Sequence, residues 1–174
     1  MTWSVYHKNL IVWRTVVRTG LRRTPLFDAF LAWSLSPHSH SKRLARSLSI
    51  VSMPHKHGSY RSVEVAAMRT LFERVVLKSL SETLNAYNLE LVLAAAARVG
   101  LHDTVLLEAL ARRTLILVPT MNTAASVASV VWALCQLRFV TPALLRALVI
   151  RLHSIQGGVT SHGKYVVASL RSLT

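Results

Sequence analysis

Hydrophobic positions between residues 91 and 151 follow a helical spacing that occurs twice. Residues 91–113 align with residues 129–151 without a gap, at an offset of about 38 residues. The aligned pairs include Val92 with Val130, Ala95 with Ala133, Leu106-Leu107 with Leu144-Leu145, Ala109-Leu110 with Ala147-Leu148, and Arg113 with Arg151. This pattern predicts two copies of a helical hairpin.

Residues that favour helix ends stand where the alignment expects them. Asn88 is predicted to cap residues 89–99, which Gly100 ends, and Asp103 to cap residues 104–117, which precede Pro119. In the second copy, Asn122 or Thr123 can begin residues 124–138, and Thr141 with Pro142 begins a helix that Gly157-Gly158 ends. The second helix of each copy is expected to expose its arginines, which are Arg112, Arg113, Arg146 and Arg151.

The helical pattern extends on both sides of these hairpins. Residues 62–80 form one long predicted helix, and Ser161 can cap a last one over residues 164–173. Parts of both resemble half units of the same repeat. The predicted fold is therefore all-α, with a short α-solenoid over residues 62–174. Arrays of this kind need about three units to be stable, so we expect neighbouring proteins to cover this one.

Residues 1–61 are predicted to form a basic extension. Leu10, Trp13, Val17 and Leu21 recur at helical spacing, with Arg14, Arg18 and Arg22 on another face. Pro25 can open a short helix over residues 26–35, before Pro37. Residues 36–60 are rich in Ser, His and basic residues, with little periodicity apart from a possible turn of helix at 44–50. We expect this part to be an extended arm that becomes ordered on a partner.

The charge of the chain favours a polyanionic partner. Its 174 residues include 21 Lys and Arg against seven Asp and Glu, for a net charge of +14. Nucleic acid is favoured over an anionic membrane. The residues predicted to bind RNA phosphates lie in the extension: Arg14, Arg18, Arg22, Arg23, Lys42, Arg43, Arg46, Lys56 and Arg61. An Arg-rich, acid-poor amphipathic N-terminus also favours mitochondrial import, the alternative being an ordinary solvated helix.

Other chemistry finds little support in the sequence. The uncharged run over residues 114–137 could cross a membrane, but Pro119 and Asn122 interrupt it, so we expect that it does not span one and that a membrane partner is disfavoured. The single Cys135 fits a reducing compartment and a packing role. His38 with His40 and His55 with His57 have metal-like spacing, but we expect them to contact RNA or solvent. No Ser/His/Asp constellation, pair of catalytic carboxylates or Gly-rich phosphate loop is recognisable, so neither a cofactor nor catalysis is predicted.

The repeat resembles a known group of proteins. Its first helix ends in Ala133-Leu-Cys-Gln-Leu137, and its second contains Leu-Leu-x-Ala-Leu at residues 106–110 and 144–148. These motifs resemble the degenerate helical repeats of organellar RNA metabolism, a class that includes FAST-kinase-like and RAP-domain proteins, octotricopeptide and heptatricopeptide repeats, and extra subunits of divergent protist mitochondrial ribosomes. The resemblance covers residues 63–174 and implies an α-solenoid with an RNA partner. Because the first helices are too apolar for a nucleotide-reading code, it favours a structural subunit.

The sequence thus predicts a structural component of a mitochondrial ribosome in the matrix. The basic extension would bind ribosomal RNA and the repeats would bind neighbouring ribosomal proteins, with no small-molecule substrate. An alternative is an assembly factor or a subunit of another mitochondrial RNA-processing complex. A further alternative, from a different class, is a membrane-associated subunit of a respiratory complex.

Overall fold

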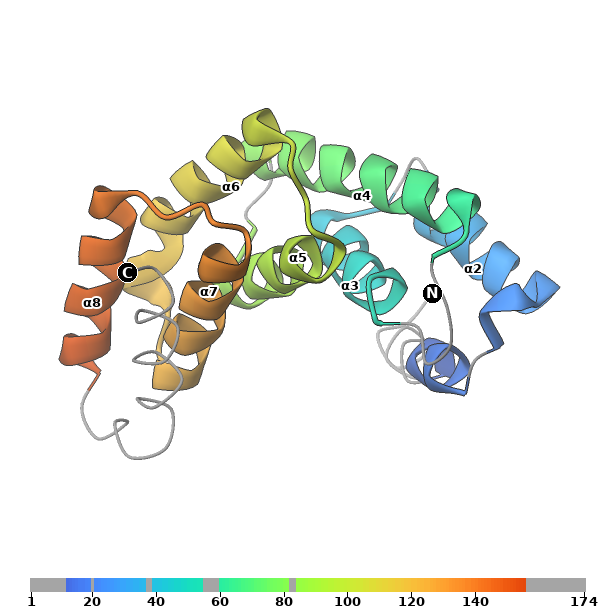
Figure 1. Cartoon of the computed structure of the whole chain (residues 1–174), viewed down its shortest axis with the longest axis horizontal. Helices are drawn as coiled ribbons and strands as arrows, with labels where there is room; N and C mark the ends of the chain where they lie inside the picture. The colour runs from blue at the N-terminus through green and yellow to red at the C-terminus, as the bar shows by residue number, and fades with distance from the viewer. Residues whose placement is uncertain (1–11, 20, 37–38, 55–59, 82–83, 156–174) are drawn as a thin grey trace. The chain divides into compact units, whose positions relative to one another are not determined.

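The computed structural model describes residues 12–19, 21–36, 39–54, 60–81 and 84–155. These residues are mainly helical and contain no strand, which confirms the all-α prediction (Figure 1). The chain divides into two compact units, residues 1–82 and residues 83–174, which we call unit 1 and unit 2. The predicted helix at residues 164–173 lies outside the described residues.

Unit 1 packs several helices around an aromatic and leucine core. Helical residues 12–18 are followed by η1 (Leu21–Arg23), α2 (Pro25–Ser34), α3 (Ser41–Val51) and α4 (Ser62–Ser81). Helix α3 packs along α4, and α2 contacts both. Pro25 begins α2, where its fixed φ suits a helix start and its missing N–H costs no hydrogen bond. The largest apolar side chains of this core include Phe27, Phe30, Phe72, Leu44, Leu48, Ile50 and Leu71.

The prediction of an extended arm over residues 36–60 is wrong for its middle part, which forms α3. Leu44, Leu48 and Val51 recur at helical spacing and are buried. Ser47 and Ser49, whose type suggested an unstructured arm, are buried on the same helix. We attribute this to their small size, which lets neighbouring helices approach closely. Because α3 packs against α4, the compact unit crosses the predicted boundary between residues 61 and 62.

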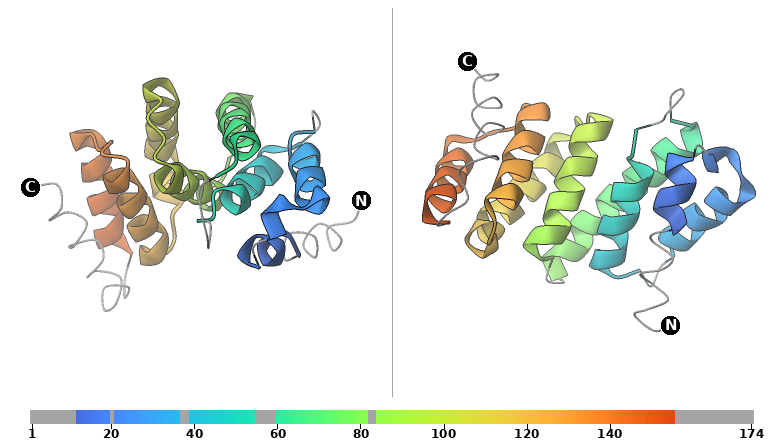
Figure 2. Two further views of the ribbon diagram at one scale, coloured as in Figure 1. Left: turned by 45° about the vertical axis from the view of Figure 1, so that its right-hand side comes forward. Right: turned by 90° about the horizontal axis from the view of Figure 1, so that it is seen from below.

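Unit 2 consists of two helical hairpins. The first is α5 (Ala86–Val99) and α6 (Thr104–Leu117); the second, after η2 (Val118–Thr120), is α7 (Ala124–Gln136) and α8 (Pro142–Ser154). Helix α5 packs against α7, and α6 against α8, and Figure 2 shows α5 and α7 side by side. The core is aliphatic, with Leu89, Val92, Leu110, Val127, Val130, Leu144 and Leu148 all buried.

Each of the α-helices α5 to α8 begins with a side-chain cap. Asn85 accepts a hydrogen bond from the backbone N–H of Asn88 (2.9 Å), and Asp103 accepts one from Leu106 (3.1 Å). In the second hairpin, Thr123 and Thr141 accept equivalent bonds, each of 3.2 Å. The caps satisfy N–H groups that have no partner inside the helix. The predicted cap Asn88 instead lies within the first turn of α5, so that helix starts earlier than expected.

The first helix of each hairpin ends on a left-handed residue. Gly100 has a φ of 61° and Arg138 a φ of 50°. The next residue in each case, Leu101 or Phe139, donates its N–H to a carbonyl in the last turn, at 3.0 Å. Gly100 and Arg138 are separated by the same offset of about 38 residues that relates the caps.

An arginine ties each hairpin back to the segment that precedes it. Arg113 of α6 donates to the carbonyl oxygen of Leu84 (3.2 Å). Arg151 of α8 donates from Nε to the carbonyl oxygen of Met121 (2.7 Å) and from Nη2 to Oδ1 of Asn122 (3.2 Å). We call these contacts the arginine clasps. Both arginines are only partly exposed, which corrects the expectation that they project into solvent.

The uncharged run over residues 114–137 does not form one continuous helix. It contains the end of α6, η2, a turn and α7. None of the helices in the described part of the chain is both long and apolar enough to span a bilayer.

Candidate polyanion-binding surface

The structure places the nine predicted RNA-binding residues in different environments. Arg14, Arg18, Arg23 and Lys42 are exposed, and Arg43 and Arg46 are partly exposed. Lys56 lies outside the described residues. The two others, Arg22 and Arg61, belong to a largely internal network of charges.

Arg22 is buried inside unit 1 and paired with a buried carboxylate. Its side chain is 2% exposed, and its Nη1 lies 3.3 Å from Oε1 of Glu64, which is fully buried. It also donates to the carbonyl oxygens of Val51 (2.9 Å) and Met53, at the end of α3. Burial lowers the pKa of Arg22, although Glu64 opposes the shift. Arginine stays charged even so, and this charge is directed into the protein instead of toward a phosphate.

Arg61 joins the same network at the start of α4. Its Nη2 lies 2.9 Å from Oδ1 of Asp28 on α2, and its backbone N–H donates to Oε2 of Glu64 at 2.8 Å. Glu64 therefore caps α4 while it pairs with Arg22. The Tyr60 hydroxyl donates to the carbonyl oxygen of Ser52 (2.8 Å). These residues, Arg22, Asp28, Tyr60, Arg61 and Glu64, form the arginine–carboxylate cluster, which links α2, α3 and α4.

Three of the remaining cations gather at the beginning of α3. His40 is the residue before the helix, and Lys42, Arg43 and Arg46 lie in its first two turns. Spacings of three and four residues place Arg46 beside Arg43 and Lys42 on the helix surface. The Arg43 guanidinium carbon lies 4.5 Å from the ring centre of Trp33 on α2, a cation–π contact that fixes its position. We call Trp33, His40, Lys42, Arg43 and Arg46 together the α3 cationic surface.

The position of these charges on α3 is unfavourable for the helix itself. A helix N-terminus carries a partial positive charge, which favours acidic side chains in the first turn and disfavours basic ones. The sequence of α3 contains three cations in its first half and no acidic residue. An anion at this surface would interact with the side chains and with the helix dipole together. The arrangement thus suits binding of phosphate groups better than it suits helix stability.

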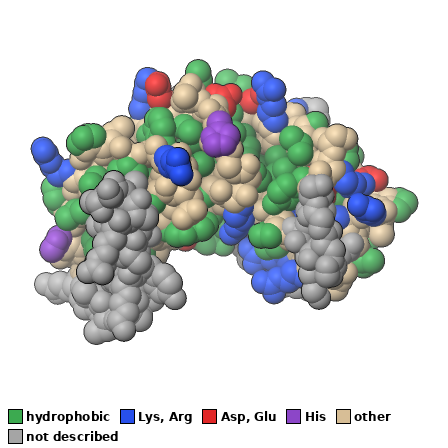
Figure 3. Space-filling model, viewed as in Figure 1, with side chains coloured by type: hydrophobic (Ala, Val, Ile, Leu, Met, Phe, Trp, Pro, Cys, Tyr) green, Lys and Arg blue, Asp and Glu red, His purple; other side chains and the backbone are tan. Residues whose placement is uncertain are grey.

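A row of aromatic rings connects this surface to the helix at residues 12–18. Trp13 stacks on Phe30 with ring centres 4.8 Å apart, and Phe30 lies 6.1 Å from Trp33. Arg14 and Arg18 project from the same helix as Trp13, four residues apart. On the face shown in Figure 3, Lys and Arg side chains gather below α3. The rings therefore link the helix that carries Arg14 and Arg18 to Trp33, which holds Arg43.

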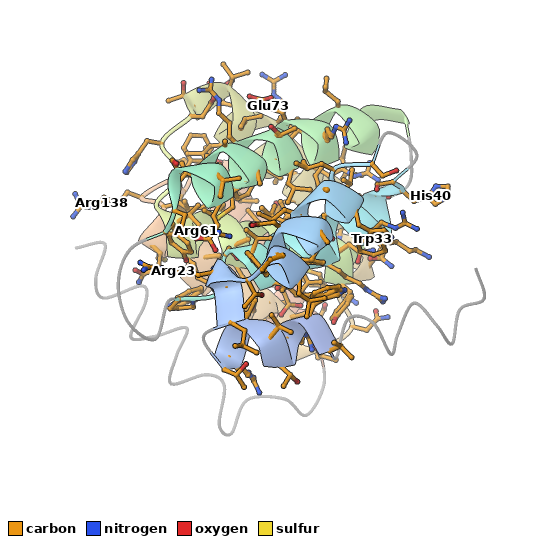
Figure 4. All side chains as sticks on the ribbon, turned by 90° about the vertical axis from the view of Figure 1, so that its right-hand side faces the viewer. Arg23, Trp33, His40, Arg61, Glu73 and Arg138 are labelled. Carbon is orange, nitrogen blue, oxygen red and sulfur yellow. The ribbon has the colours of Figure 1, made fainter. Side chains whose placement is uncertain are left out.

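Arg23 is not part of this group. Figure 4 shows Arg23 and Arg61 toward one side of unit 1, and Trp33 and His40 toward the other. The nine predicted residues therefore separate into the α3 cationic surface with its neighbours, the isolated Arg23, the internal Arg22 and Arg61, and Lys56.

Other candidate chemistry finds no site among the described residues. That part of the chain contains no group of three His, Cys, Asp or Glu side chains suited to holding a metal. His38, His55 and His57 are outside it, and His40 is exposed. Cys135 is a free, buried thiol whose pKa is raised by burial. A thiol in this environment is mostly protonated and unreactive near neutral pH.

Sequence reasoning missed Trp33 and Glu64. The spacing of Phe30 and Trp33 places both rings on one face of α2, which is a signal for a ring next to the basic stretch. Glu64 stands three residues after Arg61, the spacing of a helix cap. The chain matches no protein-family model, and no curated protein is significantly similar to it.

Proposed function

We propose that the protein is a structural component of a mitochondrial ribosome and contacts ribosomal RNA through the α3 cationic surface. The observation that carries the proposal is the collection of the exposed Lys42 and the partly exposed Arg43 and Arg46 at the start of one helix, in a chain with a net charge of +14. Arg14 and Arg18 extend the contact along the neighbouring helix. Arg22 and Arg61 are excluded from the contact set because each is paired with a carboxylate of unit 1, Arg22 with the buried Glu64 and Arg61 with Asp28.

The chemistry of this surface favours contacts with the RNA backbone. Arginine and lysine neutralise phosphates and release counterions, which gives affinity without reading sequence. The stacking of Arg43 on Trp33 holds one guanidinium in place, so less side-chain entropy is lost when it binds a phosphate. Such binding is strongly salt-dependent and suits a subunit that is held in one position by a folded RNA.

Unit 2 supports a role in packing against proteins. We propose that its two hairpins form a short α-solenoid, because their helix starts, caps, left-handed ends and arginine clasps recur at an offset of about 38 residues. Stacked hairpins bury their apolar faces against neighbours, so a short array gains stability from adjoining subunits. The basic amphipathic N-terminal sequence and the resemblance to organellar repeat proteins support a place in the mitochondrial matrix.

The test is cosedimentation of the full chain with ribosomal subunits from mitochondrial extracts, with and without ribonuclease. Substitution of Lys42, Arg43 and Arg46 by Ala should release the protein at moderate salt, and the salt dependence of RNA binding should fall by about one unit of slope for each lost contact. The control variant removes three other exposed arginines: Arg69, Arg98 and Arg112.

The outcomes separate the alternatives. Retention of the α3 variant on the ribosome at the same salt as the control would refute the proposed contact. Migration with a ribonuclease-sensitive particle other than a ribosomal subunit would identify an assembly factor or RNA-processing subunit. Retention in the membrane pellet after carbonate extraction would instead support the respiratory-complex alternative.

A further inference from the structure

An apolar groove opens on the surface of unit 2 between its two second helices. It has a volume of about 370 Å³. One wall is formed by Leu115 of α6 with Val118 and Pro119 of η2, and the other by Ala147 and Ile150 of α8. All of its lining residues belong to unit 2.

The groove is bordered by large apolar side chains that the fold leaves in water. Ile150 is 62% exposed and Leu115 is 37% exposed, while Ile116, next to Leu115, is 62% exposed. Single exposed aliphatic residues are ordinary on protein surfaces. Here they border a hollow with apolar walls, and such patches are typical of interaction sites.

The shape of the groove fits the apolar face of a helix. Ala147, Ile150 and Ser154 line it at spacings of three and four residues along α8, so they form one stripe about 10 Å long. The small side chain of Ala147 leaves room for a partner backbone to approach. Two turns of a partner helix would place apolar residues against Leu115 and Ile150, which is the usual geometry of a helix bound in a groove.

The charges around the groove are positive. Helix α8 contains Arg146 and Arg151 and no acidic residue. Arg146 is exposed and stands one turn before Ile150, so it lies at the edge of the groove. The clasp holds the Arg151 guanidinium against Met121 and Asn122, which fixes a second positive charge at the wall. A partner with acidic residues beside its apolar stripe complements this arrangement.

We propose that this groove binds an amphipathic helix with acidic flanks from a partner protein. The inference rests on the proposed function only in that the partner is a protein of the same assembly, since no RNA contact is involved. Ile150 and Leu115 would supply the apolar contact, and Arg146 would pair with an acidic residue of the partner. An apolar helix face is favoured over RNA because Leu115, Val118, Pro119, Ala147 and Ile150 supply most of the lining and Arg151 is already bonded to Met121 and Asn122.

Site-specific photocrosslinking of the full chain in its native cells tests the proposal. A photoreactive phenylalanine analogue replaces Ile150 in one strain and Val105 in another, and the crosslinked segments are identified by mass spectrometry. Val105 is the matched control because it is 74% exposed on α6 but does not line the groove. Position 150 should crosslink to a helical, acidic protein segment, and position 105 should not.

Substitutions then measure the contact. Ile150→Glu and Arg146→Glu should each weaken recovery of that partner about tenfold, whereas Val105→Glu should not. The proposal is refuted if position 150 crosslinks to RNA, to lipid, to a second copy of this chain, to a basic segment or to nothing, or if both positions crosslink equally. Binding of purified Ile150→Glu to ribosomal RNA should be unchanged, so failure here is distinguishable from failure of the proposed RNA contact.

Discussion

The two units use arginine in different ways. In unit 1, Arg22 is buried with Glu64, so two charges are removed from water and each depends on the other. In unit 2, Arg113 and Arg151 remain partly exposed and bind backbone carbonyls, one in each hairpin. A buried ion pair carries a large desolvation cost that its partner must offset, while a partly exposed hydrogen bond carries little. A single substitution in the buried pair should therefore lower the stability of unit 1 strongly. Substitution of Arg113 or Arg151 should lower the stability of unit 2 by a small and similar amount in each case.

The largest expected effect follows from Glu64→Gln. Glutamine retains an oxygen that can accept from the Arg61 N–H and keep the cap of α4, so the change removes mainly the charge. Arg22 would then be buried without a carboxylate, which costs about 3–5 kcal/mol of folding free energy. Hydrogen exchange measured by mass spectrometry should show lost protection in α2, α3 and α4, with α5 to α8 much less affected.

A matched control for this substitution is present in the same helix. Glu73 pairs with Arg69 at 3.1 Å, and both side chains are well exposed. Glu73→Gln should change stability by less than about 1 kcal/mol. Equal losses of stability from Glu64→Gln and Glu73→Gln would show that the buried pair contributes no more to stability than the exposed pair. Replacing Arg22 and Glu64 together by Met and Leu should recover most of the loss, because no uncompensated charge remains.

The same contrast explains how much of the structure could be predicted. In unit 2 the signals are local: Asp103 and Thr141 cap the helices that directly follow them, and Gly100 ends α5. A residue that bonds within a few positions leaves a pattern that a single sequence shows. The main error in the caps concerns α5, for which Asn88 was predicted as the cap and Asn85 is the observed one. The two asparagines are three residues apart, and the second donates its N–H to the side chain of the first.

In unit 1 the decisive contacts join distant positions. Arg14, Arg18 and Arg22 form one helical stripe in the sequence, yet Arg14 and Arg18 are exposed and Arg22 is buried. What distinguishes Arg22 is Glu64, which lies 42 positions later. Only a possible turn of helix was predicted where α3 forms, because the serines of α3 are buried only when α4 covers them. Composition located the basic region but could not separate surface cations from internal ones.

The arginine clasps should give intermediate and nearly equal effects. Arg113→Ala and Arg151→Ala each remove a charged donor from a backbone carbonyl, which should cost about 1–3 kcal/mol. Urea unfolding of full-length protein provides the measurement, with Arg146→Ala as the exposed control. Because each clasp lies within its own hairpin, the double variant should lose close to the sum. A strongly unequal pair would contradict the equivalence of the two hairpins.

The smallest effects are expected at the left-handed helix ends, where the two hairpins differ in residue type. The left-handed conformation costs a residue with a side chain about 1–2 kcal/mol, and glycine almost nothing. Arg138→Gly should therefore stabilise unit 2 by up to about 1 kcal/mol, since the greater freedom of glycine in the unfolded chain offsets part of the gain.

Gly100→Ala at the equivalent position should have the opposite sign. A Cβ there would lie 3.7 Å from Nε2 of His102, an ordinary contact, so the expected loss of about 1 kcal/mol comes from the backbone alone. Thermal unfolding of both variants measures the two changes against the same wild type. Stability changes of opposite sign and similar size in the two variants would establish that the ends of α5 and α7 share one backbone geometry. A loss of stability in Arg138→Gly would instead mean that the Arg138 side chain contributes more than its conformation costs.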